Sequence, residues 1–191
     1  MPNWCENQII LETDSRELYD KIKGHLEYLE ENQEEEHRLG LFGLLYPEPD
    51  YNKVDVKKYG DPNEVVKDKS QAWWDWRVVN WGTKWDIYHT GHTVTETEFN
   101  EYEDDDGNKQ YQIFIWADTA WSPPISWARE VEQRHNLNIT VKYYEGGVGF
   151  CGIYETGVGD REFDLDDLES IPEDIRDEFA LNEVYAKEEQ A

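Results

Sequence analysis

The spacing of apolar residues predicts two amphipathic helices. Leucine and isoleucine recur at helical intervals after Ser15, which is suited to capping a helix over residues 15–30. A second helix is expected over residues 124–135, with Ser122 as its cap and Asn136 as its end. Each helix has one apolar stripe, so both are expected to cover the same face of a sheet.

Short apolar or alternating runs between turn residues predict the strands of that sheet. They are expected at residues 8–13, 39–45, 111–116, 139–144 and 150–155. The resulting order of strand, helix, strand, strand, helix, strand is the split βαβ arrangement of an α+β domain with an antiparallel sheet.

The chain suits one domain with additions, because 191 residues are enough for a single core. The domain is expected to span residues 1–159, with an insertion at about 50–104 that includes a hairpin at 86–102. An acidic C-terminal extension, 160–191, is expected to dock on the domain through a short helix near residues 172–181.

Tryptophan is concentrated in one segment, since five of the nine tryptophans lie between residues 73 and 85. Indoles fill cores and also line binding sites, and both interpretations stay open. As core, Trp81 and Trp85 are expected to be largely buried beside a Gly82 with positive φ. As a ligand surface, the candidates are Asn80, Trp81, Lys84, Trp85, Asp86 and Trp121.

Four motifs resemble one family. They are Met1-Pro2-Asn3-Trp4-Cys5-Glu6-Asn7, Asn80-Trp81-Gly82-Thr83-Lys84-Trp85-Asp86, Ala120-Trp121-Ser122-Pro123-Pro124 and Tyr144-Glu145-Gly146-Gly147-Val148-Gly149-Phe150-Cys151-Gly152. Together they resemble the YubB-like proteins of phages and plasmids over residues 1–155. The resemblance implies a ferredoxin-like domain and an origin in a mobile element. It supplies no catalytic residue to carry over.

The formal charge is −26, from 44 acidic and 18 basic residues, yet aromatics make up 14% of the chain. That aromatic content favours a folded acidic domain over a disordered one. The charge argues against direct binding to nucleic acid or to an anionic membrane. The N-terminus lacks the basic and apolar regions of a signal peptide, so a cytoplasmic protein is expected.

Metal and nucleophile sites are weakly supported by the sequence. Cys5, His89, His92, Asp118 and Cys151 are suitable ligand types, but none has the spacing of a known metal motif. We therefore expect no metal, no cofactor and no catalytic residue. The two cysteines are expected to be reduced and to pack near each other on adjacent strands. The glycines at 146–149 are expected to form a tight hairpin.

The net charge far exceeds the magnitude of about 2–8 that suffices for solubility in a small domain. Its self-repulsion favours a cationic partner. The leading hypothesis is a non-enzymatic acidic binding protein that acts as a DNA mimic against a basic, nucleic-acid-binding protein of the host. The candidate partner-binding residues are Glu101, Glu103, Asp104, Asp105 and Asp106. The alternatives are a small-ligand-binding protein or enzyme that uses the tryptophan-lined surface around residues 80–86, and a structural accessory protein.

Overall fold

A computed structural model describes residues 3–32, 39–87 and 94–188. The strands are β1 (Trp4–Thr13), β2 (Lys57–Lys58), β3 (Asp61–Val65), β4 (Val94–Glu103), β5 (Lys109–Ala120), β6 (Asn138–Glu145), β7 (Phe150–Glu155) and β8 (Gly159–Asp164). The helices are α1 (Arg16–Glu31), α2 (Leu41–Leu45), α3 (Ala72–Asn80), α4 (Ile125–His135), a 3-10 turn at Leu168–Ser170, α5 (Glu173–Glu178) and α6 (Leu181–Glu188).

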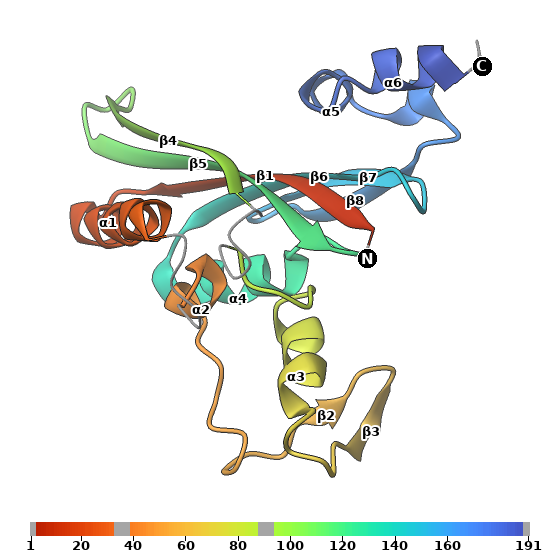
Figure 1. Cartoon of the computed structure of the whole chain (residues 1–191). Helices are drawn as coiled ribbons and strands as arrows, with labels where there is room; N and C mark the ends of the chain where they lie inside the picture. The colour runs from red at the N-terminus through yellow and green to blue at the C-terminus, as the bar shows by residue number, and fades with distance from the viewer. Residues whose placement is uncertain (1–2, 33–38, 88–93, 189–191) are drawn as a thin grey trace.

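Six strands form one sheet in the order β4-β5-β1-β6-β7-β8, and every neighbouring pair is antiparallel (Figure 1). The first four strands of that order, with α1 after β1 and α4 after β5, make the ferredoxin-like split βαβ core. The α+β class predicted from the sequence is therefore confirmed. β7 and β8 extend the sheet beyond this core.

The two long helices cover the same face of the sheet, as predicted (Figure 1). Ser15 caps α1 by accepting a hydrogen bond from the Leu18 amide, and Asn136 ends α4 in the left-handed conformation. Ser122 does not cap α4. Its hydroxyl instead donates to the Gly82 carbonyl oxygen at 2.5 Å. The buried side chains of both helices belong to one core with the odd-numbered residues of β1 and β5.

The expected strand at residues 39–45 is wrong, because the structure has the short helix α2 there. The second strand of the ferredoxin-like core is β4, which pairs with β5 across a hairpin turn at Asp106-Gly107. Residues 94–103 therefore belong to the core sheet and not to an inserted hairpin. β4 alternates polar residues with few apolar ones because it is an edge strand whose open face is exposed to water.

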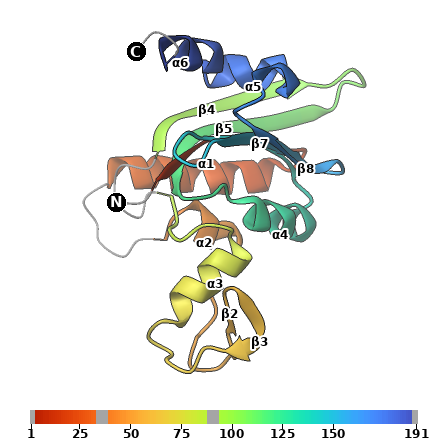
Figure 2. The same cartoon turned by 90° about the vertical axis from the view of Figure 1, so that its right-hand side faces the viewer.

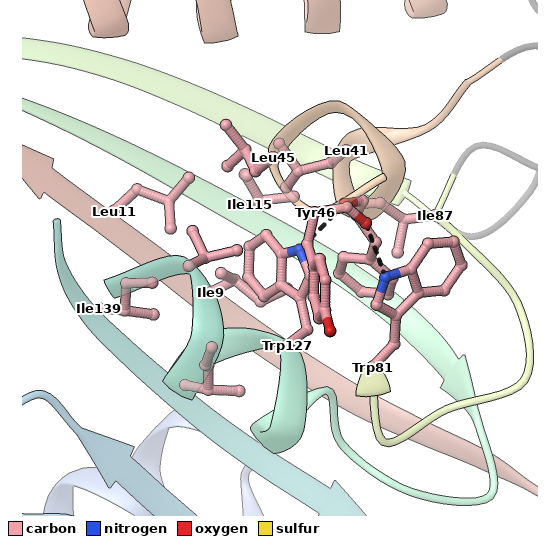
Figure 3. Close-up of a cluster of buried hydrophobic side chains, with 14 of the residues drawn as sticks. Ile9, Leu11, Leu41, Leu45, Tyr46, Trp81, Ile87, Ile115, Trp127 and Ile139 are labelled. Carbon is pink, nitrogen blue, oxygen red and sulfur yellow. Dashed lines mark hydrogen bonds between the residues drawn. The ribbon is translucent and has the colours of Figure 1, made fainter. Parts of the chain in front are cut away.

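The inserted part of the chain lies between α1 and β4. Its helix α3 and the small sheet of β2 and β3 extend away from the helix layer (Figure 2). α2 and Trp81 return to the core, where Figure 3 shows Trp81 and Trp127. The Phe42 ring packs against both indoles, with centroid distances of 5.9 Å to Trp81 and 4.9 Å to Trp127. Trp81 Nε1 donates to the Tyr46 carbonyl oxygen at 3.1 Å, and Trp127 Nε1 donates to the Phe42 carbonyl oxygen at 3.2 Å.

The C-terminal segment packs on the other face of the sheet (Figure 1). β8 is the outer strand beside β7, and α5 lies in the region where a short helix was expected. This segment packs on the sheet through a second, smaller apolar cluster. Its buried members are Cys151, Ile153, Leu165, Ile171, Ile175 and Leu181.

The two cysteines do not pack near each other as expected. Both are buried thiols, but Cys5 lies on β1 in the core under the helices, whereas Cys151 lies on β7 in the cluster under α5. β6 separates their strands. The register and the two separate apolar clusters show that the two side chains point to opposite faces of the sheet. Burial raises the pKa of the Cys5 thiol far above its ordinary value and that of Cys151 to about 11. Both thiols are therefore poor nucleophiles.

Candidate binding surface at one end of the sheet

The four sequence motifs meet at one end of the sheet. β1 begins there, β5 ends there, and the β6–β7 hairpin turns there, because neighbouring strands are antiparallel. Trp4 is opposite Ala120 in the register, and the Trp121 amide donates to the Asn3 carbonyl oxygen at 2.9 Å. The motifs are far apart in the sequence but lie close together in the structure. This end of the sheet is therefore the candidate functional surface.

Residues 81–86 are held against the end of β5 by hydrogen bonds and close packing. Thr83 Oγ1 donates to the Ala120 carbonyl oxygen and accepts from the Ala120 amide, both at 3.1 Å. Gly82 has φ of +86°, as predicted, and a Cβ there would lie 2.9 Å from the Pro123 carbonyl oxygen. This segment is thus a rigid support.

Asp86 is a structural residue in this support. Its carboxylate is 4% exposed and accepts hydrogen bonds from the amides of Phe42 and Gly43, each at 2.8 Å. It thereby satisfies two amides at the start of α2. Burial raises the pKa of Asp86 to about 7, although the two amide hydrogen bonds act in the opposite direction.

Three indoles remain accessible at the end of the sheet, and we call Trp4, Trp85 and Trp121 the tryptophan platform. Trp4 is 39% and Trp121 45% exposed, and the Trp4 and Trp85 ring centroids are 5.9 Å apart. The Lys84 ammonium lies 4.4 Å from the Trp85 ring centroid and 5.3 Å from that of Trp121. Trp121 has φ of +68°, which is rare for a bulky residue and is held by the surrounding hydrogen bonds.

A cleft of about 250 Å³ adjoins the platform, between α5 and the face of the sheet that the long helices leave open. We call it the acidic cleft. It is lined by Glu6, Asn7, Trp116, Ala117, Asp118, Glu178 and Phe179. Glu178 holds α5 over the sheet by accepting from Gln8 Nε2 at 2.6 Å and from Trp116 Nε1 at 2.9 Å. Glu178 therefore has a structural role in the wall of the cleft.

Glu6 and Asp118 face each other across β1 and β5. Glu6 is exposed and Asp118 is half-buried. Desolvation raises the pKa of both carboxyls, and the charge of Asp118 raises that of Glu6 further. Like charges directly opposite on neighbouring strands repel, so this pair favours a cation between or beside the two groups.

A family model described as the ferredoxin-like domain in Api92-like protein matches residues 84–184, which is just over half of the chain. The chain belongs to this family. Neither the curated proteins nor the solved structures include a match. The matched region runs from the last residues of the Trp81–Asp86 support into α6, so it contains Trp85, Trp121 and Asp118. Trp4 and Glu6, on the central strand β1, lie outside it.

In this member of the family, the predicted ligand surface is divided between core and platform. Trp81 and Asp86 are buried, and the Asn80 side chain accepts from the Tyr46 hydroxyl and donates to the Trp76 carbonyl oxygen. Lys84, Trp85 and Trp121 do come together at the surface. Sequence reasoning missed Trp4, Glu6, Asp118 and Glu178 as members of this surface. The alternation along β1 was the available signal for Trp4 and Glu6, which share a face.

The five predicted partner-binding acids lie on β4 and its turn but have different local roles. Asp104 shapes the turn by accepting from the amides of Asp106 and Asn108 at 3.0 and 2.8 Å. Glu101 accepts from Arg16 at 3.1 Å. Glu103, Asp105 and Asp106 are exposed, which leaves these three side chains accessible to a partner.

Within residues 3–32, 39–87 and 94–188, no three histidine, cysteine, aspartate or glutamate side chains are arranged to hold a metal ion. The candidate ligands His89 and His92 lie outside the described residues. No helix in the described part of the chain is long and apolar enough to cross a membrane.

Proposed function

We propose that this protein is a non-enzymatic acidic binding protein that occupies the nucleic-acid-binding surface of a basic partner. The four motifs that resemble YubB-like proteins of phages and plasmids support a mobile-element origin. A host protein that binds or processes DNA, including a defence protein, is then the expected target. The proposal is that carboxylates of this chain take the place of phosphates of a duplex.

The excess of carboxylates at the surface is the observation that carries the proposal. The chain has 44 acidic and only 18 basic residues. Among the described residues, ten ion pairs already engage many of these cations with neighbouring acids. Charged residues on an edge strand also discourage aggregation, but that purpose does not require a net charge of −26. The surface is suited to a strongly basic partner.

The open face of the sheet arranges part of this charge in a regular array. Glu96 and Glu98 on β4 are opposite Trp116 and Phe114 of β5, and thus share a face with Asp118. Glu6 and Glu12 lie on the same face of β1. Alternate residues on a strand are about 7 Å apart, and neighbouring strands are about 4.8 Å apart. This rigid, closely spaced array supports mimicry of a duplex, which carries a charge about every 1.7 Å of its axis.

Capture of a partner tests the proposal. The purified protein is immobilised and incubated with host lysate, and the retained proteins are eluted with increasing salt and identified. The expected result is basic, nucleic-acid-binding proteins that elute between about 50 and 200 mM added salt, because the distance over which exposed charges interact falls about twofold across that range. Retention that is insensitive to salt would instead favour the alternative of a ligand surface at the tryptophans.

Neutralising the hairpin is expected to weaken binding to the captured partner. The variant Glu103→Gln, Asp105→Asn, Asp106→Asn removes three exposed charges and retains Asp104, which shapes the turn. Exposed ion pairs contribute about 0.2–1 kcal/mol each. The Kd is therefore expected to rise by about threefold to about 150-fold, as measured by calorimetry at low salt.

The matched control removes the same charge from α1, through Glu27→Gln, Glu30→Gln and Glu31→Gln. If the hairpin is the contact surface, this control changes the Kd much less than the hairpin variant. An unchanged Kd for the hairpin variant, together with a large loss of affinity for the α1 variant, would show that the partner contacts α1 and not the hairpin.

A further inference from the structure

We propose that the tryptophan platform is the docking surface for an arginine-bearing segment of the partner, and that the acidic cleft beside it receives the guanidinium group. This inference rests on the proposed function, because it assumes a basic partner. It adds a second contact, at the opposite end of β5 from the hairpin, and the type of side chain that is recognised there.

The platform and the cleft form one continuous surface. Trp4 and Glu6 are two residues apart on the same face of β1, and they are opposite Ala120 and Asp118 of β5. Trp121 follows Ala120 directly. A chain that packs on the indoles therefore has the two carboxylates within about 7 Å along the strand. Such an arrangement gives an apolar anchor with a charged neighbour, as in energetically important interface regions.

The platform already binds one cation of the chain itself. Lys84 lies over the Trp85 and Trp121 rings, and it forms no ion pair with any described residue. Within the described part of the chain, this ammonium contacts the indole faces and not a carboxylate. The observation is independent of the carboxylates and shows that the indoles are suitably placed for cation–π contact.

The carboxylate pair supplies charge complementarity to the same ligand. Within the described residues, neither Glu6 nor Asp118 takes part in an ion pair. A cation that binds between them removes the repulsion of two like charges on adjacent strands. Trp116 and Phe179 supply aromatic surface in the wall of the cleft.

Arginine fits this combination better than lysine. Its planar guanidinium stacks on aromatic rings and binds carboxylates through a fork of N–H donors, whereas an ammonium is a compact and strongly hydrated charge. The cleft volume of about 250 Å³ is smaller than the range of about 300–1,000 Å³ that is typical of small-molecule sites. A single side chain presented by a protein is therefore the favoured occupant.

Two short peptides of equal charge test the inference. The probes are tetra-arginine and tetra-lysine, each acetylated and amidated, and binding is followed by NMR of the tryptophan indole N–H signals at low salt. Tetra-arginine is expected to bind at least about tenfold more tightly than tetra-lysine, because only guanidinium combines stacking with paired hydrogen bonds. Its shifts are expected at Trp4, Trp85, Trp116 and Trp121.

Matched variants locate the site. Glu6→Gln with Asp118→Asn is expected to weaken tetra-arginine binding at least about tenfold. Glu103→Gln with Asp105→Asn removes the same charge at the hairpin and is expected to change the Kd less than about twofold. Trp121→Gly removes one indole at a position where φ of +68° suits glycine, so the fold is expected to survive while arginine binding weakens.

Equal affinity for the two peptides, or equal losses in the two double variants, would overturn this site. Salt-dependent capture of a basic partner would still stand after that result, because long-range attraction does not require the cleft. Conversely, an arginine preference at the platform, without capture of any basic protein, would leave the docking site in place and remove the proposed function.

Discussion

Replacing Trp81 by alanine is expected to lower the free energy of unfolding by about 3–5 kcal/mol, the range typical of buried aromatic residues. Its indole is 1% exposed and packs against Phe42 and Trp76, with ring centroids 5.9 and 5.6 Å apart. Arg77 lies over the same ring at 5.0 Å. The substitution also leaves the Tyr46 carbonyl oxygen without the indole donor.

Chemical denaturation of the Trp81→Ala variant measures this loss. The control is Trp121→Gly, which removes an equally large side chain from the surface, where it is 45% exposed. The control is expected to change stability by much less than the core variant. A Trp81→Ala protein as stable as the parent would show that this indole does not belong to the core.

Asp86 is expected to make stability depend on pH. Its folded-state pKa, about 7, is above the ordinary value of 3.8, so the folded state favours the protonated carboxyl. The contribution to stability is therefore fully present below about pH 4 and is lost as pH rises through about 7. Because each pKa unit corresponds to about 1.36 kcal/mol, the loss amounts to at most about 4 kcal/mol.

Comparison with Asp86→Asn isolates this effect from the many other acids of the chain. Unfolding free energies of both proteins are measured from pH 4 to pH 8, and their difference is taken at each pH. The difference in favour of the parent is expected to shrink with rising pH, since asparagine does not ionise. A constant difference over this range would show that Asp86 has the same pKa in the folded and unfolded states.

The helices and the general order of the core were predictable because their signals are local. Leu18, Ile22, Leu26 and Leu29 recur at helical spacing after a capping serine, and the structure places α1 there. The Asp106-Gly107 turn was equally predictable from its residues, but the place of the preceding strand, β4, in the core sheet was not. β4 contributes little apolar area, so its place in the sheet depends on pairing with β5, which residue patterns on β4 alone do not encode.

Residues 39–45 show where local patterns are insufficient. An apolar run of this length fits a buried strand or a short buried helix. Asp86, more than forty residues away in the sequence, stabilises the helix by accepting hydrogen bonds from the amides of Phe42 and Gly43. A Cβ at Gly40 would collide with the same carboxylate, so that contact depends on glycine. Long-range contacts of this kind have no short sequence signature.

Only part of the candidate surface was predictable, again because the rest depends on contacts between residues far apart in the sequence. Trp85 and Trp121 were recognised from their motifs, whereas the acidic cleft depends on the register that places Glu6 opposite Asp118. The cleft also needs α5, whose Glu178 bonds to Gln8 more than 160 residues away in the sequence. Neither relation follows from spacing along the chain.

Competition with duplex DNA is the most direct test of the proposed mimicry. A labelled duplex is bound to the basic partner identified by capture, and increasing amounts of this protein are added while fluorescence anisotropy is recorded. The account predicts full displacement of the duplex, with an affinity that falls as salt rises and falls further in the hairpin variant. A ternary complex, in which the partner holds the duplex and this protein together, would contradict it.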